Sequence, residues 1–433
     1  MINELNIGIV GLGTVGSGVI KSLEKNIDYF KNNHNVKFNI NAISASSKNK
    51  TRSFNVENYL WINNPLDILD KENIDTVIEL IGGEDGLAYE LAINSLKKGM
   101  NFITANKALI SKHGQKLAEL SDTTGNFFGY EASVAGGIPI IKTLKESLIL
   151  NEIRKFYAIL NGTSNYILSS MGNSNIGFDE ALKDAQEKGF AEADPTLDIN
   201  GEDSAHKLSI LNSIVFSEIP SIETININGI ENVDLIDHKY SSEFGYKIRL
   251  IAMSEVADNG VYKEVAPMLV EQNGSLGCVE GANNIIKIIG QEKGDVVLEG
   301  QGAGEGPTSS SVIADLIDCA LGKKSHLFSN PYDELSNNKL KISAKKRPYY
   351  LRLYLKDQKG SMSELTQLLS ANNISLDKII QKDERLFTHK DFKPVVIITY
   401  PVKKEEIDSL IDKLNSSDII SSKALHMAIL NEG

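Results

Sequence analysis

The chain has 433 residues, of which 41% are hydrophobic and 24% charged, with 34 Gly and 10 Pro. This composition excludes a collagen-like, disordered or disulfide-rich chain, and the length predicts two or three globular domains. The net charge of -12 argues against nucleic acid and anionic membranes as partners. No signal peptide and no apolar run of membrane-spanning length is evident, so we expect a soluble cytoplasmic protein.

The first predicted element is an apolar strand, residues 5–10, that runs directly into a glycine-rich turn and then a helix over 14–29. The turn has the spacing G-x-G-x-x-G. In this arrangement the first glycine permits a tight turn, the second lets the backbone approach a pyrophosphate, and the third allows close helix packing. The alternative is a glycine-rich turn that binds nothing. The candidate cofactor-binding residues here are Gly11, Leu12, Gly13, Thr14, Val15 and Gly16.

A second strand is predicted over residues 36–44, and its end indicates which dinucleotide binds. An acidic residue at this point would bind the ribose 2′-hydroxyl of NAD. The chain instead has Ser44, Ser46 and Ser47, followed by Lys48, Lys50 and Arg52. These groups favour the 2′-phosphate of NADP(H) over NAD(H), although loop charges are commonly only solvated.

Two further strands, 75–81 and 101–105, flank a predicted helix over 86–98. The repeated strand–helix pattern predicts a mostly parallel sheet, in which ligands lie beyond the carboxyl ends of the strands. Lys107 follows one of these ends, so it is a candidate for binding or catalysis. A surface lysine at a helix start is the alternative.

An acidic segment follows in the middle of the chain. Asp203 and Lys207 are spaced i, i+4 and would share one face of a helix. The pair is either an exposed ion pair or an amine held by carboxylates for proton transfer. The other acids of the segment are Glu192, Asp194, Asp198 and Glu202.

The C-terminal part begins after a polar stretch, residues 326–347, that is typical of a linker. The elements then predicted alternate as β-α-β-β-α-β, the order of a ferredoxin-like domain. The predicted strands lie at 349–355, 374–380, 394–400 and 419–428, and the helices follow Gly360 and cover 405–414.

Five motifs together resemble one known family. They are GLGTVGSG, TANKALI, YEASVAGGIPII, LNGTSNYIL and GFAEADPTLDINGEDSAHKL, in this order between residues 5 and about 320. This combination resembles homoserine dehydrogenase of the monofunctional type. The resemblance implies reversible NAD(P)H-dependent reduction of L-aspartate 4-semialdehyde to L-homoserine, a step in threonine, methionine and isoleucine biosynthesis.

The resemblance also implies roles for individual residues. Lys207 matches the catalytic lysine, and Lys107 is similar to a second lysine near cofactor and substrate. Glu192 and Asp203 match substrate-binding residues. Gly304 and Glu305 lie in a segment that closes over the cofactor in the family, although this chain has Gln301 where a proline is expected.

YEASVAGGIPII resembles a sodium-binding turn of the family. Hard cations prefer oxygen ligands, and the matching positions are Glu131, Val134, Gly136 and Ile138. The ion would be structural. The alternative is a tight turn without an ion.

The C-terminal domain resembles an ACT domain, an amino-acid-sensing module. The loop after its first strand has Lys359-Gly360 where Pro-Gly is usual. A threonine effector is one expectation, and a role in oligomerisation alone is the other. The family resemblance also implies that the protein forms a homodimer or homotetramer.

The expected fold is therefore α/β, with a Rossmann-type nucleotide domain, an α+β catalytic and oligomerisation domain, and the ferredoxin-like domain. Their expected boundaries are 1–135 completed by about 302–325, then 136–301, the linker 326–347, and 348–433.

Two other functions fit the sequence less well. An aldehyde dehydrogenase acting on aspartyl phosphate needs a cysteine nucleophile, and Cys278 and Cys319 lie in no suitable motif. A non-catalytic ligand sensor is disfavoured by the intact lysines and carboxylates.

Overall fold

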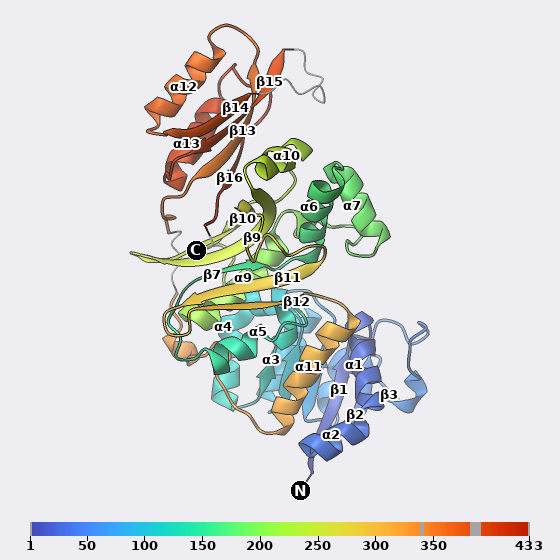
Figure 1. Ribbon diagram of the computed structural model, residues 1–433. Helices are drawn as coiled ribbons and strands as arrows, with labels where there is room; N and C mark the ends of the chain where they lie inside the picture. Colours follow the sequence, from blue (N-terminus) through green and yellow to red (C-terminus); the bar gives the residue numbers. More distant parts are fainter. Residues whose placement is uncertain (1, 338–341, 382–390, 432–433) are drawn as a thin grey trace. The chain divides into compact units, whose positions relative to one another are not determined.

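The structure is a computed structural model that describes residues 2–337, 342–381 and 391–431 (Figure 1). The chain forms two compact units, each assembled from segments far apart in the sequence. The first comprises 1–153, 203–224 and 284–339, and the second comprises 154–202, 225–283 and 340–433. The first unit thus takes residues 203–224 from the middle of the predicted catalytic domain.

A parallel sheet organises the first unit. Its strands lie in the order β3 (Leu60–Trp61), β2 (Val36–Ser44), β1 (Asn3–Val10), β4 (Thr76–Glu79), β5 (Asn101–Thr104) and β6 (Phe128–Gly129). Every neighbouring pair is parallel. The prediction of β2 is confirmed residue for residue, and the parallel sheet is confirmed with it. Two further strands of this unit are neighbours, β11 (Asn283–Gly290) and β12 (Asp295–Gln301).

The helices of the first unit include the one expected after the glycine-rich turn, but the predicted helix 14–29 is wrong at its end. It breaks at Asn26, which leaves helical geometry (φ −116°, ψ 23°) and whose side chain donates a hydrogen bond to the Ser22 carbonyl. The helices are α1 (Thr14–Lys25), α2 (Ile27–His34), α3 (Leu87–Lys97), α4 (Lys107–Thr124), α5 (Ile140–Lys142), α9 (Glu202–Phe216) and α11 (Glu305–Ala320). Shorter turns of helix cover Val56–Asn58, Pro65–Asp70, Glu131–Ser133, Thr143–Ser147 and Tyr332–Glu334.

α1 and α11 share one hydrophobic core with β1. Val19 of α1 and Val312 of α11 are fully buried together with Ile7 of the strand. Burial of side chains of this size contributes roughly 1.5–3 kcal/mol each. The segment that closes the first unit is therefore fixed against the helix that follows the glycine-rich turn.

The predicted linker is packed rather than free. Phe328 is fully buried, its ring centroid lies 6.2 Å from that of Tyr130, and the Tyr130 hydroxyl donates to the Leu327 carbonyl. The polar composition of the segment conceals these few apolar anchors. Residues 338–341 of this prediction lie outside the described residues.

The second unit contains a mixed sheet with helices around it. Its strands lie in the order β7 (Ile153–Ile159), β9 (Tyr246–Ala257), β10 (Gly260–Glu271) and β8 (Asn226–Ile227). β9 and β10 form a long antiparallel hairpin whose inner residues are buried. The helices are α6 (Gly162–Ser174), α7 (Phe178–Glu187), α8 (Thr196–Ile199) and α10 (Leu235–Glu243).

The C-terminal part of the second unit has the predicted β-α-β-β-α-β order. The elements are β13 (Tyr349–Lys356), α12 (Ser361–Ala371), β14 (Leu376–Gln381), β15 (Phe392–Thr399), α13 (Lys404–Asn415) and β16 (Leu425–Ala428). They form an antiparallel sheet in the order β14-β15-β13-β16. The last predicted strand, 419–428, is too long, because Ile420 makes only an isolated bridge to Leu355 before β16 begins.

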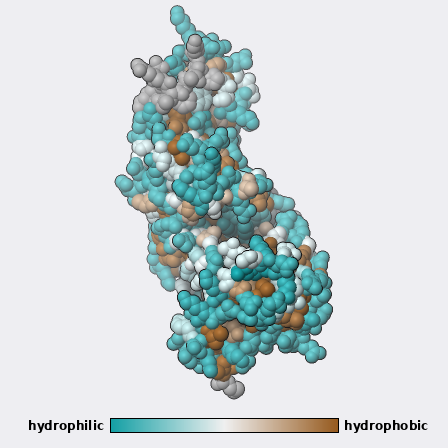
Figure 2. All heavy atoms as spheres, turned by 90° about the vertical axis from the view of Figure 1, so that its right-hand side faces the viewer, coloured by the Kyte–Doolittle hydropathy of each residue, from teal (hydrophilic) through white to brown (hydrophobic). Residues whose placement is uncertain are grey.

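Hydrophilic residues predominate on the face in Figure 2, where hydrophobic residues form small scattered patches. Within the described ranges, no helix is both long and apolar enough to cross a membrane.

Candidate functional site

The glycine-rich turn has the geometry that its spacing predicts. Gly11 has φ +100°, and a Cβ there would lie 2.4 Å from the Leu80 carbonyl oxygen. A Cβ on Gly16 would lie 2.0 Å from the Gly11 oxygen, whereas a Cβ on Gly13 would meet nothing within 4 Å. Gly11 and Gly16 are thus required for close packing, and Gly13 leaves open space before the first turn of α1. Such a helix start offers N–H groups to a phosphate.

The start of α11 lies against the first turns of α1. The Ser309 hydroxyl donates to the Val15 carbonyl at 3.1 Å, and a Cβ on Gly18 would lie 2.6 Å from Cγ of Glu305. Gly304 precedes the helix with φ +123°. The structure therefore brings the two cofactor candidates at 304 and 305 next to the helix that follows the glycine-rich turn.

The loop after β2 is held together by the polar residues that predicted NADP(H). Ser44 is buried and donates to the Ile62 carbonyl at 2.8 Å. Arg52 donates to the carbonyls of Ser47, Lys48 and Lys50. The guanidinium thus fixes the loop that carries the two lysines.

Two lysines share one buried carboxylate. The Lys207 Nζ lies 2.7 Å from Oδ2 of Asp203, one turn earlier on α9, and the Lys107 Nζ lies 3.3 Å from Oδ1. The side chains of Asp203 and Lys207 are 7% and 13% exposed, and that of Lys107 is 41% exposed. The sequence predicted the Asp203–Lys207 pair, but it did not indicate that Lys107 joins it from α4.

A buried hydrogen bond connects the two helices that carry these groups. The Ser209 hydroxyl of α9 donates to the His206 carbonyl at 2.8 Å, so the Ser111 hydroxyl of α4 donates to Ser209, at 2.7 Å. Both serines are buried. The bond holds α4 against α9 one turn beyond Lys107.

Glu192 lies in the second unit, on the exposed segment between α7 and α8, where its backbone carbonyl accepts a hydrogen bond from the Gln186 side chain at 3.1 Å. The structure thus groups Lys107, Asp203 and Lys207 within the first unit, and Glu192 belongs to the other one.

The predicted cation-binding turn is buried and internally hydrogen-bonded. The Glu131 carboxylate accepts the backbone N–H groups of Ile141 and Lys142, each at 2.9 Å, and so caps α5. The Gly136 carbonyl accepts the Ser311 hydroxyl at 2.6 Å. Burial raises the pKa of Glu131 to about 7, with a smaller contribution from Asp315.

Three polar residues that the sequence analysis did not select lie at the carboxyl ends of β4 and β5. They are Glu79, Thr104 and Asn106, all of them buried. The signal in the sequence was a polar residue at each of two neighbouring strand ends. Glu79 stands three residues before Gly82, and Thr104 stands three residues before Lys107.

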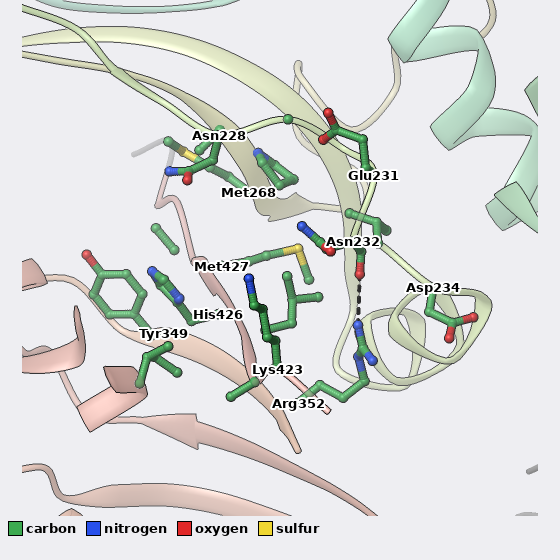
Figure 3. A pocket seen from close by; sticks show the side chains of 18 of the residues that line it. Asn228, Glu231, Asn232, Asp234, Met268, Tyr349, Arg352, Lys423, His426 and Met427 are labelled. Atoms are coloured by element: carbon green, nitrogen blue, oxygen red, sulfur yellow. Dashed lines mark hydrogen bonds between the residues drawn. The ribbon is translucent and has the colours of Figure 1, made fainter. Parts of the chain in front are cut away.

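The second unit contains a pocket of about 690 Å³ whose walls carry opposite charges (Figure 3). One wall comes from the chain before β13 and has the acids Asp179, Glu231, Asp234 and Glu264. The other comes from the β-α-β-β-α-β part and has the cationic or titratable residues Arg352, Lys404, Lys423 and His426.

Arg352 joins these two walls. Its Nε donates to the fully buried Asp237 carboxylate at 2.9 Å. Its Nη2 donates to the Asn232 carbonyl at 2.8 Å (Figure 3). The Tyr350 hydroxyl donates to the same Asp237 oxygen at 2.8 Å. Removing one partner of a buried ion pair is strongly destabilising. The Arg352–Asp237 pair is therefore expected to stay formed, and it holds one edge of the pocket in place.

Comparison with known proteins agrees with this geometry. Residues 11–131 match the family described as the NAD binding domain of homoserine dehydrogenase, and residues 139–317 match the family described as homoserine dehydrogenase. The homoserine dehydrogenases of Helicobacter pylori and Bacillus subtilis are 37% and 32% identical, over 96% and 97% of this chain and 96% of each relative.

Solved structures give the same result. The crystal structure of a homoserine dehydrogenase from Thiobacillus denitrificans has a TM-score of 0.90 at 33% identity, covering 99% of both chains. A hyperthermophilic archaeal homoserine dehydrogenase in complex with NADPH has a TM-score of 0.62 at 25% identity, covering 73% of this chain and 98% of that one. The chain therefore belongs to the homoserine dehydrogenase family of NAD(P)-dependent oxidoreductases.

Proposed function

We propose that the two lysines on Asp203 carry the acid–base chemistry of a reversible interconversion of L-homoserine and L-aspartate 4-semialdehyde. The observation that supports this is the 2.7 Å contact between Lys207 and a carboxylate that also holds Lys107. A buried carboxylate holds neighbouring ammonium groups in place by charge-assisted hydrogen bonds. The cofactor, when bound, donates or accepts the hydride.

The roles of the residues follow from the charge that develops on the substrate. Reduction places negative charge on the aldehyde oxygen, and a positioned ammonium stabilises this charge. Lys207 donates a hydrogen bond and then its proton to that oxygen, and takes the proton back in the oxidation. Lys107 supplies a second positive charge. Asp203 orients both lysines. From the family resemblance, Asp203 is also proposed to bind the amino acid, and Glu192 to contact its amino group or an ordered water.

Lys207→Ala is expected to lower kcat by about 10²- to 10⁴-fold, because it removes the proton donor. Binding of the cofactor, followed by the fluorescence of NADPH, should change little. Lys207→Arg should also be slow, because a guanidinium keeps the charge but does not release a proton. Lys116→Ala, an exposed lysine of α4 paired with Glu119, is the control. Turnover close to normal in Lys207→Ala would contradict the proposed role.

We propose NADP(H) as the preferred cofactor. The end of β2 has no carboxylate, and Arg52 holds the loop with Lys48 and Lys50 in one conformation. The archaeal relative described in complex with NADPH supports the same preference.

The kcat/KM for NADPH should therefore exceed that for NADH. Lys50→Ala should reduce the kcat/KM for NADPH and leave that for NADH unchanged, since only NADPH carries the 2′-phosphate. The difference between the two cofactors should therefore become smaller. A higher kcat/KM for NADH in the unchanged protein would overturn the preference.

We also propose a structural sodium ion at the turn of Glu131. The donors would be the Glu131 carboxylate and the carbonyls of Val134, Gly136 and Ile138, oxygens of the type that hard cations prefer. The Glu131 oxygens and the Gly136 carbonyl each accept one N–H or O–H and keep a second lone pair, so these residues fit the ion.

Sodium chloride should then raise the thermal midpoint above that in choline chloride at equal ionic strength, since an ion that binds only the folded state stabilises it. Glu131→Gln should remove the difference between the two salts. Equal midpoints in both salts for the unchanged protein would contradict the site.

For the C-terminal domain we propose an ACT-like regulatory role with threonine as the effector. What supports it is the β-α-β-β-α-β order and the pocket with oppositely charged walls, which suits a zwitterion. A homodimer or homotetramer is proposed from the family resemblance, and light scattering of the purified protein tests it.

Calorimetric titration of L-threonine should give heat and a loss of activity at millimolar concentration. Lys423→Ala removes a charge from the pocket, and Lys359→Ala removes one from the loop before Gly360. The variant in which threonine binding weakens shows which of the two positions the effector contacts. The absence of both heat and inhibition in the unchanged protein would leave oligomerisation as the role of the domain.

A further inference from the structure

The carboxyl ends of β4 and β5 are joined by a buried chain of hydrogen bonds. This chain is separate from the contacts that Asp203 makes with Lys107 and Lys207. Glu79 is the last residue of β4 and Thr104 the last of β5, and both are fully buried. The two strands are paired, with Glu79 opposite Thr104. These side chains therefore lie side by side at the edge where a parallel sheet binds its ligands.

Each bond in this chain has a defined direction. The Glu79 carboxylate accepts the backbone N–H groups of Ile81 at 2.7 Å and Gly82 at 3.0 Å on one oxygen. Its other oxygen accepts the Thr104 hydroxyl at 2.7 Å. Thr104 Oγ1 in turn accepts the backbone N–H of Asn106 at 2.9 Å. One carboxylate thus fixes the turn after β4 and, through a hydroxyl, Asn106, the residue that directly precedes α4.

Asn106 carries the chain of bonds into the helix. Its Oδ1 accepts the Leu109 N–H at 3.1 Å and caps α4, while its Nδ2 donates to the Gly83 carbonyl at 2.6 Å. Lys107 is the first residue of that helix. The direction in which its backbone leaves the sheet is therefore set by Thr104 and Asn106 before its ammonium reaches Asp203.

We propose that Glu79 and Thr104 are positioning residues for Lys107, acting through Asn106. This inference rests on the proposed acid–base role of the lysine pair. A half-exposed lysine has many rotamers, so a fixed backbone origin is needed to bring its Nζ to Asp203 in every molecule. Loss of the Thr104 hydroxyl leaves a buried Asn106 N–H and a Glu79 oxygen without partners, and the start of α4 then shifts to satisfy them.

Thr104→Val tests the inference, because valine has the same shape and lacks the hydroxyl. Its kcat is expected to fall by about 10- to 100-fold, the scale of a small misplacement of a reacting group. KM for aspartate semialdehyde and NADPH affinity by fluorescence should stay near those of the unchanged protein. Thr104→Ser restores the hydroxyl and should restore kcat. Thr123→Val, at an exposed threonine near the end of α4, is the matched control.

The inference is overturned if folded Thr104→Val keeps its kcat, if Thr104→Ser loses kcat as far as valine does, or if the loss is entirely in NADPH affinity. Should Thr104→Val fail to fold by circular dichroism, Glu79→Gln carries the test. It keeps an oxygen for the two backbone N–H groups and presents an N–H to Thr104, so kcat should fall while cofactor binding persists. An unchanged kcat in Glu79→Gln overturns the inference. An unchanged protein without homoserine dehydrogenase activity instead refutes the proposed function.

Discussion

The buried carboxylate of Asp203 is the interaction on which the proposed chemistry depends. Two ammonium groups close together repel each other, and a carboxylate removed from water needs positive partners. Asp203 meets both requirements at once, with one oxygen for each lysine. Lys207 is placed by the i, i+4 spacing on α9, whereas Lys107 depends on where α4 begins and how it packs on α9.

The parallel sheet explains why the relevant groups of the first unit gather at one edge. β1, β4 and β5 are neighbours, and they end respectively at the glycine-rich turn, at Glu79 and at Thr104. The open space at Gly13 and the start of α4 therefore lie at the same edge. A dinucleotide over the first helix and a substrate near Lys107 would both use this edge, which is the general rule for open α/β sheets.

Structural features that depend on neighbouring residues in the sequence were predicted well. β2 was predicted over its full range, the Asp203–Lys207 pair follows from a spacing of four residues, and the β-α-β-β-α-β order follows from the succession of strand-like and helix-like segments. Contacts between distant segments were not accessible in this way. The sequence does not reveal that Lys107 reaches Asp203 across 96 residues, nor that Glu79 accepts the Thr104 hydroxyl. The sequence also did not show that two candidate ligand-binding residues make structural contacts. Arg52 donates hydrogen bonds to carbonyls of its own loop, and Glu131 caps α5.

A crystal structure of the chain with NADP⁺ and L-homoserine tests the account most directly. The account predicts the 4-hydroxyl oxygen of homoserine within hydrogen-bond distance of the Lys207 Nζ, with both lysines still on Asp203 and the pyrophosphate against the backbone at Gly13. A hydroxyl held by other groups, with the lysines directed away from it, would contradict the central claim that the shared carboxylate organises the acid–base chemistry.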